Sequence, residues 1–494
     1  MRVKFIFIIS LIVLIQSCKK IDYKKNKELY LQEQLEFAQS ISKFIKQNKY
    51  TLHILNQKEF THKIDSLQSI FTKFLANYKD KLDQKTVYEE TILIKISFDR
   101  FILEYPELHK RYTGKHSSLS KENQSKLNRN FKILNDTTFY TTRDLKKYIT
   151  SYIKLEADKK LRNGYFSSLD NQQLHANWSV INKMFTNYTI SDYWKHKYLD
   201  YHINNFGIKN IAKIYSNFIA TCKSTKFIEN ISKLYNAHKK GREDHVIETY
   251  KVIDGFKLDM HLFLPDFKKF KGKRPTIIKF HGGSWSEGKP DWFFSTAKAY
   301  TEKGWVVAVV EYRIKGRQNT YPFESVKDAK SAIRWVKEHA KRYNIDDTKI
   351  IATGDSAGGH LSLALALVDN WNEGTDNLLI NAKPTAIIVN AGVYDLTTRE
   401  TSWITATYKN KDIAKEISPN HLIKKSKVKM LLIHGDKDRN CPYETARYFY
   451  KEMKAIGNTI ELHTVKNAKH FIWYGKHAEE VSKITSEYIG KLNY

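Results

Sequence analysis

Cysteine is scarce in this sequence, and its placement excludes a zinc-finger arrangement. The 494 residues contain three cysteines, Cys18, Cys222 and Cys441, which lie far apart along the chain. Zinc fingers need closely spaced pairs of ligands, and no such pair is present. Cys222 and Cys441 lie one in each half of the chain, so the sequence predicts two free, partly buried thiols and no metal site.

Acidic residues are outnumbered, with 53 Asp and Glu against 83 Lys and Arg, which gives a formal net charge of +30. A basic chain can attract anionic glycans, lipid headgroups or nucleic acid. The lysines are spread over both halves, which favours solvated basic faces rather than a binding tail. Walker-type phosphate loops and aromatic-basic RNA-binding signatures are both absent, so we expect neither a nucleic-acid partner nor a cofactor.

Long apolar runs are also absent, apart from one at the start of the chain. "MRVKFIFIISLIVLIQSC" has a basic start, an apolar run and a polar ending, which is the plan of a secretory signal. Its ending resembles a bacterial lipoprotein box. This resemblance implies cleavage of residues 1–17, lipidation of Cys18 and attachment to the cell-envelope membrane, facing the periplasm or the surface. The alternative interpretation is a buried N-terminal helix.

Glycine and proline are rare from residue 22 to residue 240. Apolar residues recur there at steps of three and four, as in "NIAKIYSNFIATCKSTKFIENISKLYNA". This period predicts amphipathic helices packed on one another. The segment contains no chemical motif, so residues 22–240 are predicted to be a helical domain whose function the sequence does not indicate.

The pattern changes after the charged cluster "KKGRED", and strand-like alternation begins at Val246. Apolar runs such as "TIIKF", "VVAVVEY", "KIIAT" and "KMLLIH" alternate with helical segments. Residues 246–494 are therefore predicted to form a separate α/β domain, whose mostly parallel sheet has helices on both faces. Sites in such sheets form at the carboxyl ends of the strands.

One of these ends carries the motif Gly-Asp-Ser-Ala-Gly, residues 354–358, directly between "KIIAT" and the helical run "HLSLALALV". A G-x-S-x-G motif between a strand and a helix is typical of a nucleophile elbow. Small neighbours let the chain reverse around Ser356, and the N–H of Ala357 faces the charge that develops on a substrate oxygen. Ser356 is the predicted nucleophile.

A serine nucleophile needs a base, and the base needs an orienting acid. The loop after "KMLLIH" offers Asp438, which we prefer, and Asp436, which remains the alternative. His470 follows the last predicted strand and is the preferred base. Three other histidines compete with it: His434, His463 and His477.

The reaction also needs donors for a developing oxyanion. Strand "TIIKF" ends at His281-Gly282-Gly283-Ser284-Trp285, where glycines let backbone N–H groups approach a substrate oxygen. In this interpretation His281 and Gly282 support the loop and do not act as the base.

"HGGSW", the segment around "GDSAGGHLS" and "HGDKDRNCPYE" resemble the α/β-hydrolase esterases of the hormone-sensitive-lipase and acetyl-esterase type, close to bacterial feruloyl and acetyl carbohydrate esterases. The likeness covers residues 246–494. It implies a triad of Ser356, Asp438 and His470, and oxyanion donors from Gly283, Ser284 and Ala357. Ser284 stands where glycine or alanine is commoner in the family, and Lys469 and Phe471 stand where glycines are usual.

The resemblance implies a serine carboxylesterase that removes acetyl or aromatic acyl groups from small molecules or polysaccharides. Two alternatives remain open at this point. One is a peptidase resembling prolyl oligopeptidase, whose β-propeller has no counterpart in the helical first half. The other is a non-catalytic binding lipoprotein on a hydrolase scaffold.

Overall fold

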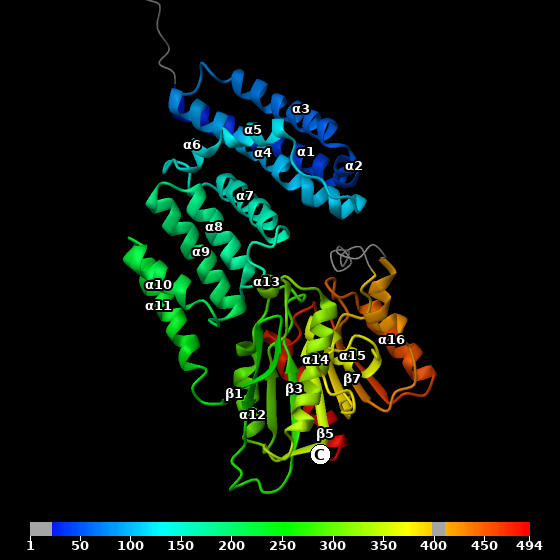
Figure 1. Cartoon of the computed structure of the whole chain (residues 1–494). Helices are drawn as coiled ribbons and strands as arrows, with labels where there is room; N and C mark the ends of the chain where they lie inside the picture. Colours follow the sequence, from blue (N-terminus) through cyan, green and yellow to red (C-terminus); the bar gives the residue numbers. More distant parts are fainter. Residues whose placement is uncertain (1–21, 398–410) are drawn as a thin grey trace, which may run out of the picture. The chain divides into compact units, whose positions relative to one another are not determined.

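The structure is a computed structural model that describes residues 22–397 and 411–494, so the predicted signal segment and Cys18 lie outside the described residues. The described chain is helical as far as Lys240 and alternates between strands and helices from Val246 onward (Figure 1). It separates into two compact units. The first extends to Ile133 and includes Thr142–Tyr148, and the second contains Leu134–Thr141 and Ile149–Tyr494.

The first unit is a set of helices that begin at polar capping residues. The side chains of Asp22, Asn56, Asp83 and Ser120 each accept a hydrogen bond from a backbone N–H in the first turn of their helix. Such caps satisfy N–H groups that have no partner within the helix. The helices are α1 (Tyr23–Gln47), α2 (Lys49–Ile54), α3 (Gln57–Ala76), α4 (Gln84–Thr113) and α5 (Lys121–Asn128); α6 (Phe131–Leu134) and α7 (Arg143–Arg162) each contain residues of both units.

The second unit begins with helices as well. They are α8 (Gln172–Met184), α9 (Tyr188–Phe206), α10 (Ala212–Thr221) and α11 (Thr225–Lys240). Their apolar faces share a core that includes Trp178, Leu199, Ile203 and Phe218. This packing confirms the helical pattern predicted from the three- and four-residue steps. No helix in the described ranges has the length and apolar content needed to cross a membrane.

A sheet of eight strands follows, with the spatial order β1-β2-β4-β3-β5-β6-β7-β8. The pairs β1–β2 and β2–β4 are antiparallel, and every later pair is parallel. The strands are β1 (Val246–Ile253), β2 (Phe256–Phe263), β3 (Arg274–Phe280), β4 (Val306–Val310), β5 (Ile345–Asp355), β6 (Ala386–Asn390), β7 (Lys429–Gly435) and β8 (Ile460–Val465).

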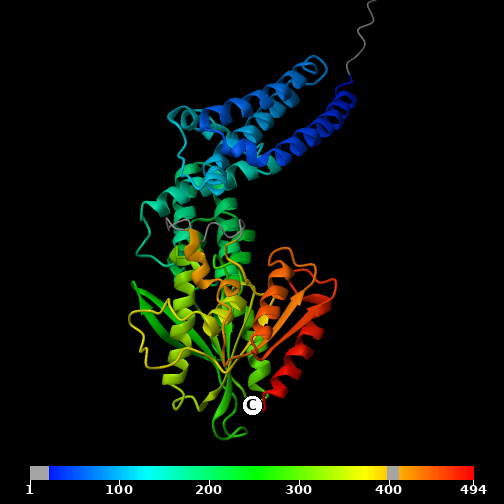
Figure 2. The same cartoon turned by 90° about the vertical axis from the view of Figure 1, so that its right-hand side faces the viewer.

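Helices cover both faces of the sheet, as the two perpendicular views show (Figures 1 and 2). One apolar core joins the sheet to α14 (Pro322–Glu338), α15 (Ala357–Leu367) and α16 (Tyr443–Ala455). The opposite core joins it to α12 (Phe294–Thr301) and α17 (Ala478–Lys491). The predicted fold class is confirmed: a mostly parallel sheet covered on both faces, preceded by a helical region.

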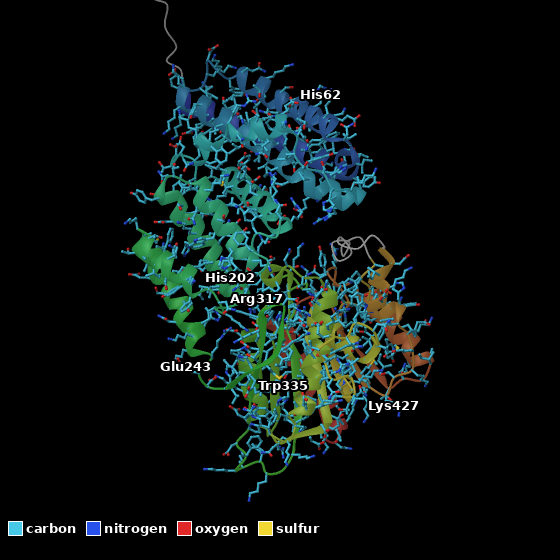
Figure 3. The ribbon with its side chains drawn as sticks, viewed as in Figure 1. His62, His202, Glu243, Arg317, Trp335 and Lys427 are labelled. Carbon is cyan, nitrogen blue, oxygen red and sulfur yellow. The ribbon has the colours of Figure 1, made fainter. Side chains whose placement is uncertain are left out.

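The compact units do not divide at the change of sequence pattern near Lys240, because α8–α11 share a unit with the sheet. Buried ion pairs join these two parts. Arg317 on α13 (Lys315–Gln318) bonds to Asp170 and Glu311, and Lys209 bonds to Glu311 at 2.5 Å. Arg317 and His202 of α9 lie where the two parts meet (Figure 3).

Candidate active site

Ser356 stands alone between β5 and α15, in a backbone conformation that a residue with a side chain rarely adopts. Its φ is 54° and its ψ is −115°. Strain of this kind persists only where the surroundings enforce it. A Cβ on Gly358 would lie 1.9 Å from the carbonyl oxygen of Phe280, so this neighbour must be glycine for the turn to pack on β3. The Ser356 N–H donates to the Asn390 carbonyl at 2.9 Å, which ties the elbow to β6.

His470 and Asp438 form a buried hydrogen-bonded pair. The distance between His470 Nδ1 and Asp438 Oδ2 is 2.7 Å, and both residues are less than a tenth exposed. Burial alone would raise the pKa of Asp438, but hydrogen bonds from His434, His470 and the Cys441 N–H hold it well below its usual range. An ionised carboxylate on Nδ1 keeps the proton there and leaves Nε2 free to accept one.

The other candidate acid and bases lie elsewhere. In the described part of the chain, the recorded carboxylate partner of His470 is Asp438, and the buried Oδ1 of Asp436 has no hydrogen-bond partner. His434 bonds through Nε2 to the Cys441 carbonyl at 2.8 Å and so supports the loop that carries Asp438. His463 and His477 face Glu461 and Glu480 at 3.4 and 3.7 Å.

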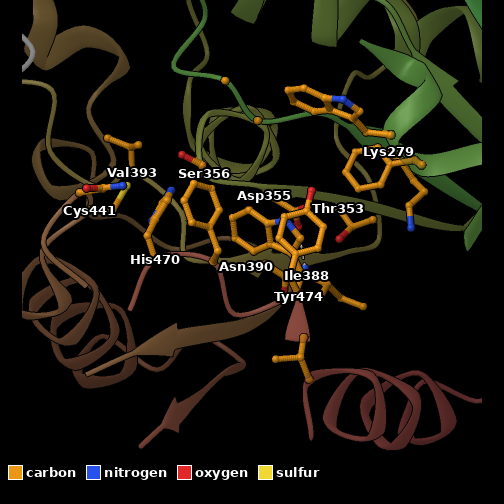
Figure 4. Close-up of a pocket in the computed structure, with 18 of the residues that line it drawn as sticks. Lys279, Thr353, Asp355, Ser356, Ile388, Asn390, Val393, Cys441, His470 and Tyr474 are labelled. Atoms are coloured by element: carbon orange, nitrogen blue, oxygen red, sulfur yellow. Dashed lines mark hydrogen bonds between the residues drawn. The ribbon is translucent and has the colours of Figure 1, made fainter. Parts of the chain in front are cut away.

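Ser356 and His470 line one cleft of about 1170 Å³, and Figure 4 shows the imidazole turned toward the serine side chain. Eight aromatic side chains form part of the cleft wall. These side chains are Trp285, Trp292, Phe293, Tyr300, Tyr394, Phe471, Trp473 and Tyr474. Gly283 and Ser284 line the same cleft. The structure thus brings together the nucleophile, acid, base and two oxyanion donors that the sequence singled out.

The loop after β3 carries the candidate oxyanion donors Gly283 and Ser284, and at Gly283 its backbone shape admits only glycine. Gly283 has φ 101°, and a Cβ there would lie 2.1 Å from the Glu287 carbonyl oxygen. Within the described ranges the N–H groups of Gly283 and Ser284 donate no backbone hydrogen bond, which leaves them available to a ligand. Ala357 is the first residue of α15, where helix N–H groups lack internal acceptors.

His281 is fully buried under this loop. Burial lowers the pKa of His281 to about 4, so the ring is neutral at physiological pH. Its Nδ1 lies 2.7 Å from the Gly282 carbonyl oxygen, and Tyr312 donates to the His281 carbonyl at 2.6 Å. These contacts place His281 and Gly282 in the support of the loop.

Helices α9 and α11 hold the same loop from outside. The N–H of Gly288 donates to the Asn205 carbonyl at 2.9 Å, and Lys289 Nζ donates to the Ile203 carbonyl at 2.9 Å. Tyr201 donates to the carboxylate of Glu287. Asp291 lies 2.8 Å from His238 and 3.1 Å from Arg242. The helical segment, which contains no chemical motif, therefore contacts the loop of the candidate oxyanion donors.

Cys441 was not singled out for the site, but its thiol lies beside the acid and the base. One ligand atom from each of Asp438, Cys441 and His470 lies within 4.8 Å of the others. Burial raises the pKa of the Cys441 thiol to about 12, so it is protonated at neutral pH and a poor metal ligand. Cys222 and Cys441 are both buried and free.

Lys279 was also missed, because its position in "TIIKF" reads as the polar member of an alternating strand. It is buried, and its Nζ lies 4.9 Å from the centre of the Phe293 ring and 5.4 Å from that of Tyr300. A lysine one residue before the end of β3 is the available signal, since side chains at that end of a parallel sheet face the site.

Part of the chain is similar to known esterases. The family profile described as BD-FAE matches residues 260–453. The chain is 30% identical to esterase LipQ of Mycobacterium tuberculosis, over 40% of this chain and 51% of that protein. It is 35% identical to the probable carboxylic ester hydrolase LipM of the same organism, over 26% and 29% of the two chains. The chain thus spans about half or less of the length of these curated relatives.

Among solved structures, Thermogutta terrifontis esterase 2 shares 29% identity over 51% of this chain and 96% of its own, with a TM-score of 0.47. The family profile and the curated relatives confirm the resemblance drawn from the motifs. The C-terminal half has the mostly parallel sheet described above and is similar to α/β-hydrolase esterases of the hormone-sensitive-lipase type.

Proposed function

We propose that this protein is a serine carboxylesterase that removes acetyl or aromatic acyl groups from carbohydrates. The observation that carries the proposal is the 2.7 Å contact between His470 Nδ1 and Asp438 Oδ2, in the cleft that Ser356 also lines. The curated relatives support ester hydrolysis because they are named esterases.

In the proposed reaction, neutral His470 takes the proton of Ser356 as Oγ attacks the ester carbonyl. The N–H groups of Gly283, Ser284 and Ala357 donate to the oxyanion of the tetrahedral intermediate. His470 then protonates the leaving alcohol, and water attacks the acyl-enzyme in a second cycle. Asp438 stays ionised throughout and stabilises the imidazolium.

The aromatic cleft wall supports the carbohydrate and aromatic acyl part of the proposal. Phe293, Trp473 and Tyr474 offer flat apolar faces beside the nucleophile. Such faces pack against sugar rings and phenyl groups alike. A panel of acetylated xylan, other acetylated glycans, feruloyl sugars and short-chain aryl esters tests this proposal. Hydrolysis of prolyl anilides in preference to every ester would replace it with a peptidase.

We also propose that residues 1–17 are a signal segment and that Cys18 is lipidated, which would anchor the enzyme to the bacterial envelope. The basis is the apolar run that ends at Ser17-Cys18. Mass analysis of the mature N-terminus tests the anchor, and an unmodified N-terminus well beyond Cys18 would rule it out.

A further inference from the structure

The cleft continues from Ser356 along one face of the sheet, between the strands, α12 and α17. The register of the strands orders the side chains on this face. Asp355 of β5 pairs with Asn390 of β6 at the strand ends, directly before the serine. One step deeper, Lys279 of β3 pairs with Thr353. All four residues line the cleft (Figure 4), and we call this part the inner chamber.

The next step along the strands is apolar. Ile277 pairs with Ile351 two residues below Lys279 and Thr353, which is roughly 7 Å deeper at the rise of a β-strand. Ile489 of α17 also lines the cleft, whereas Ile388 of β6 pairs with Thr353 and so lies at the level of Lys279. With increasing distance from the nucleophile, the cleft is therefore first mostly polar and then apolar.

Within the described ranges, two polar groups of the inner chamber lack a hydrogen-bond partner: the ammonium of Lys279 and the buried Oδ1 of Asn390. Lys279 is 8% exposed, and its Nζ makes no hydrogen bond or ion pair with any residue in the described part of the chain. Its contacts are the rings of Phe293 and Tyr300, which attract a cation but accept no conventional hydrogen bond. Burial lowers the pKa of Lys279 to about 8, so most of the lysine still carries its charge at neutral pH.

Asp355 faces Lys279 across the chamber without touching it. Its Oδ1 accepts from Asn390 Nδ2 at 2.9 Å, and its charge acts on Lys279 from beyond ion-pair distance. Burial raises the pKa of Asp355 to about 6, so it is mostly ionised at neutral pH. A group that joins Lys279 to Asp355 must accept from an ammonium and donate to a carboxylate.

A hydroxyl group meets both requirements and adds no charge, whereas a carboxylate would face Asp355 with a like charge. We propose that the inner chamber binds a hydroxyl group on the acyl part of the ester, a few carbons from the carbonyl, with an apolar chain beyond it. The substrate class is thus a hydroxyacyl ester. This inference rests on the proposed esterase function, because the acyl group must reach the chamber from Ser356, and it adds a hydroxyacyl chain to the acetyl and aromatic acyl groups proposed above.

The test compares methyl 3-hydroxyoctanoate and methyl 5-hydroxyoctanoate with methyl octanoate, using the full chain and a pH-stat at pH 7. We expect kcat/KM for at least one hydroxy ester to exceed that for octanoate by about tenfold to a hundredfold, the usual worth of a hydrogen bond to a charged group. Lys279→Met should bring that ratio close to one. Thr353→Val, which changes the same step of the chamber without touching a charge, should lower the ratio less.

Lys303→Met is the matched control, because the Lys303 Nζ lies 5.9 Å from the centre of the same Tyr300 ring but the residue is exposed, in the turn that follows α12. It should keep the wild-type ratio. Equal rates on all three esters in the wild type would overturn the chamber proposal and leave a bridging water as the occupant. If the folded Lys279→Met protein still has a higher kcat/KM for a hydroxy ester than for methyl octanoate, the chamber proposal is also overturned. Failure to hydrolyse any ester, p-nitrophenyl acetate included, would overturn the esterase function and this inference together.

Discussion

The backbone N–H of Gly288 donates to the carbonyl oxygen of Asn205 at 2.9 Å, across 83 positions of sequence. Gly288 ends the loop that carries Gly283 and Ser284, and Asn205 lies in the last turn of α9. Together with the hydrogen bonds that Tyr201 and Lys289 make, this bond makes the helical segment a support of residues 281–288. We call these residues the oxyanion loop, because they carry the candidate oxyanion donors. Neither the family profile, which begins at residue 260, nor the motifs extend to that segment.

Loosening this support should slow the reaction more than it weakens substrate binding. Tyr201→Phe removes the hydrogen bond to Glu287, whose backbone packs against Gly283. We expect kcat to fall about fivefold, the worth of roughly 1 kcal/mol of hydrogen bonding, with little change in KM. Steady-state kinetics on p-nitrophenyl acetate measures this.

Tyr188→Phe is the control, since Tyr188 begins the same helix and is 66% exposed. Affinity for an aryl boronate, which forms a tetrahedral adduct with the serine, should fall in Tyr201→Phe only. Equal effects of the two substitutions would remove α9 from the mechanism.

The triad has its own test. Ser356→Ala should lower kcat/KM for an aryl ester by on the order of 10³-fold or more, while thermal unfolding stays cooperative. Asp438→Asn should be far more damaging than Asp436→Asn, because only Asp438 contacts His470. A Ser356→Ala protein that retained half its activity would refute the nucleophile. The reverse order of the two aspartates would move the acid to Asp436.

These residues also show what a sequence can and cannot predict. Ser356 and the loop with Gly282 and Gly283 belong to local sequence motifs. The residues of such a motif determine its backbone conformation, so the sequence alone predicts it. His470 follows from strand order, and Asp438 could be separated from Asp436 only as a preference until side-chain positions were available. Tyr201 and Asn205 belong to no local motif, and the one signal for Lys279 was its place next to the end of β3. Their importance depends on contacts between distant segments, and helical periodicity does not say what a helix face packs against.

Acid should destabilise the second unit through Asp291. Burial alone would raise the pKa of Asp291, but its hydrogen bond to His238 and the charges of Arg242 and Lys289 hold it well below its usual range. A carboxylate whose pKa is depressed by folding stabilises the protein above its unfolded pKa of about 3.9. That stability is lost as the pH falls below this value.

Urea unfolding between pH 7 and pH 3 measures the effect. Asp291→Asn should lower the free energy of unfolding at pH 7. Between pH 7 and pH 3, the free energy of unfolding of this variant should fall less than that of the wild type. Asp347→Asn, at an exposed carboxylate of the same unit, should follow the wild-type curve. Parallel curves for Asp291→Asn and wild type would show that Asp291 does not carry the acid sensitivity.

The shape of the oxyanion loop can be tested at Gly283 against a glycine that shares its backbone handedness. Gly283 has φ 101° and a Cβ there would lie 2.1 Å from the Glu287 carbonyl oxygen, so Gly283→Ala must move the loop. Gly255 has φ 81° with nothing within 4 Å of the added carbon, so Gly255→Ala introduces the backbone strain without the clash. Both variants should lose some stability, since alanine is disfavoured at positive φ.

Because one misplaced oxyanion donor costs about 10²-fold or more in kcat, only Gly283→Ala should show that loss of kcat. If Gly255→Ala is equally inactive while folded, the loss reflects general destabilisation; if Gly283→Ala keeps full activity, the N–H groups of this loop do not bind the oxyanion.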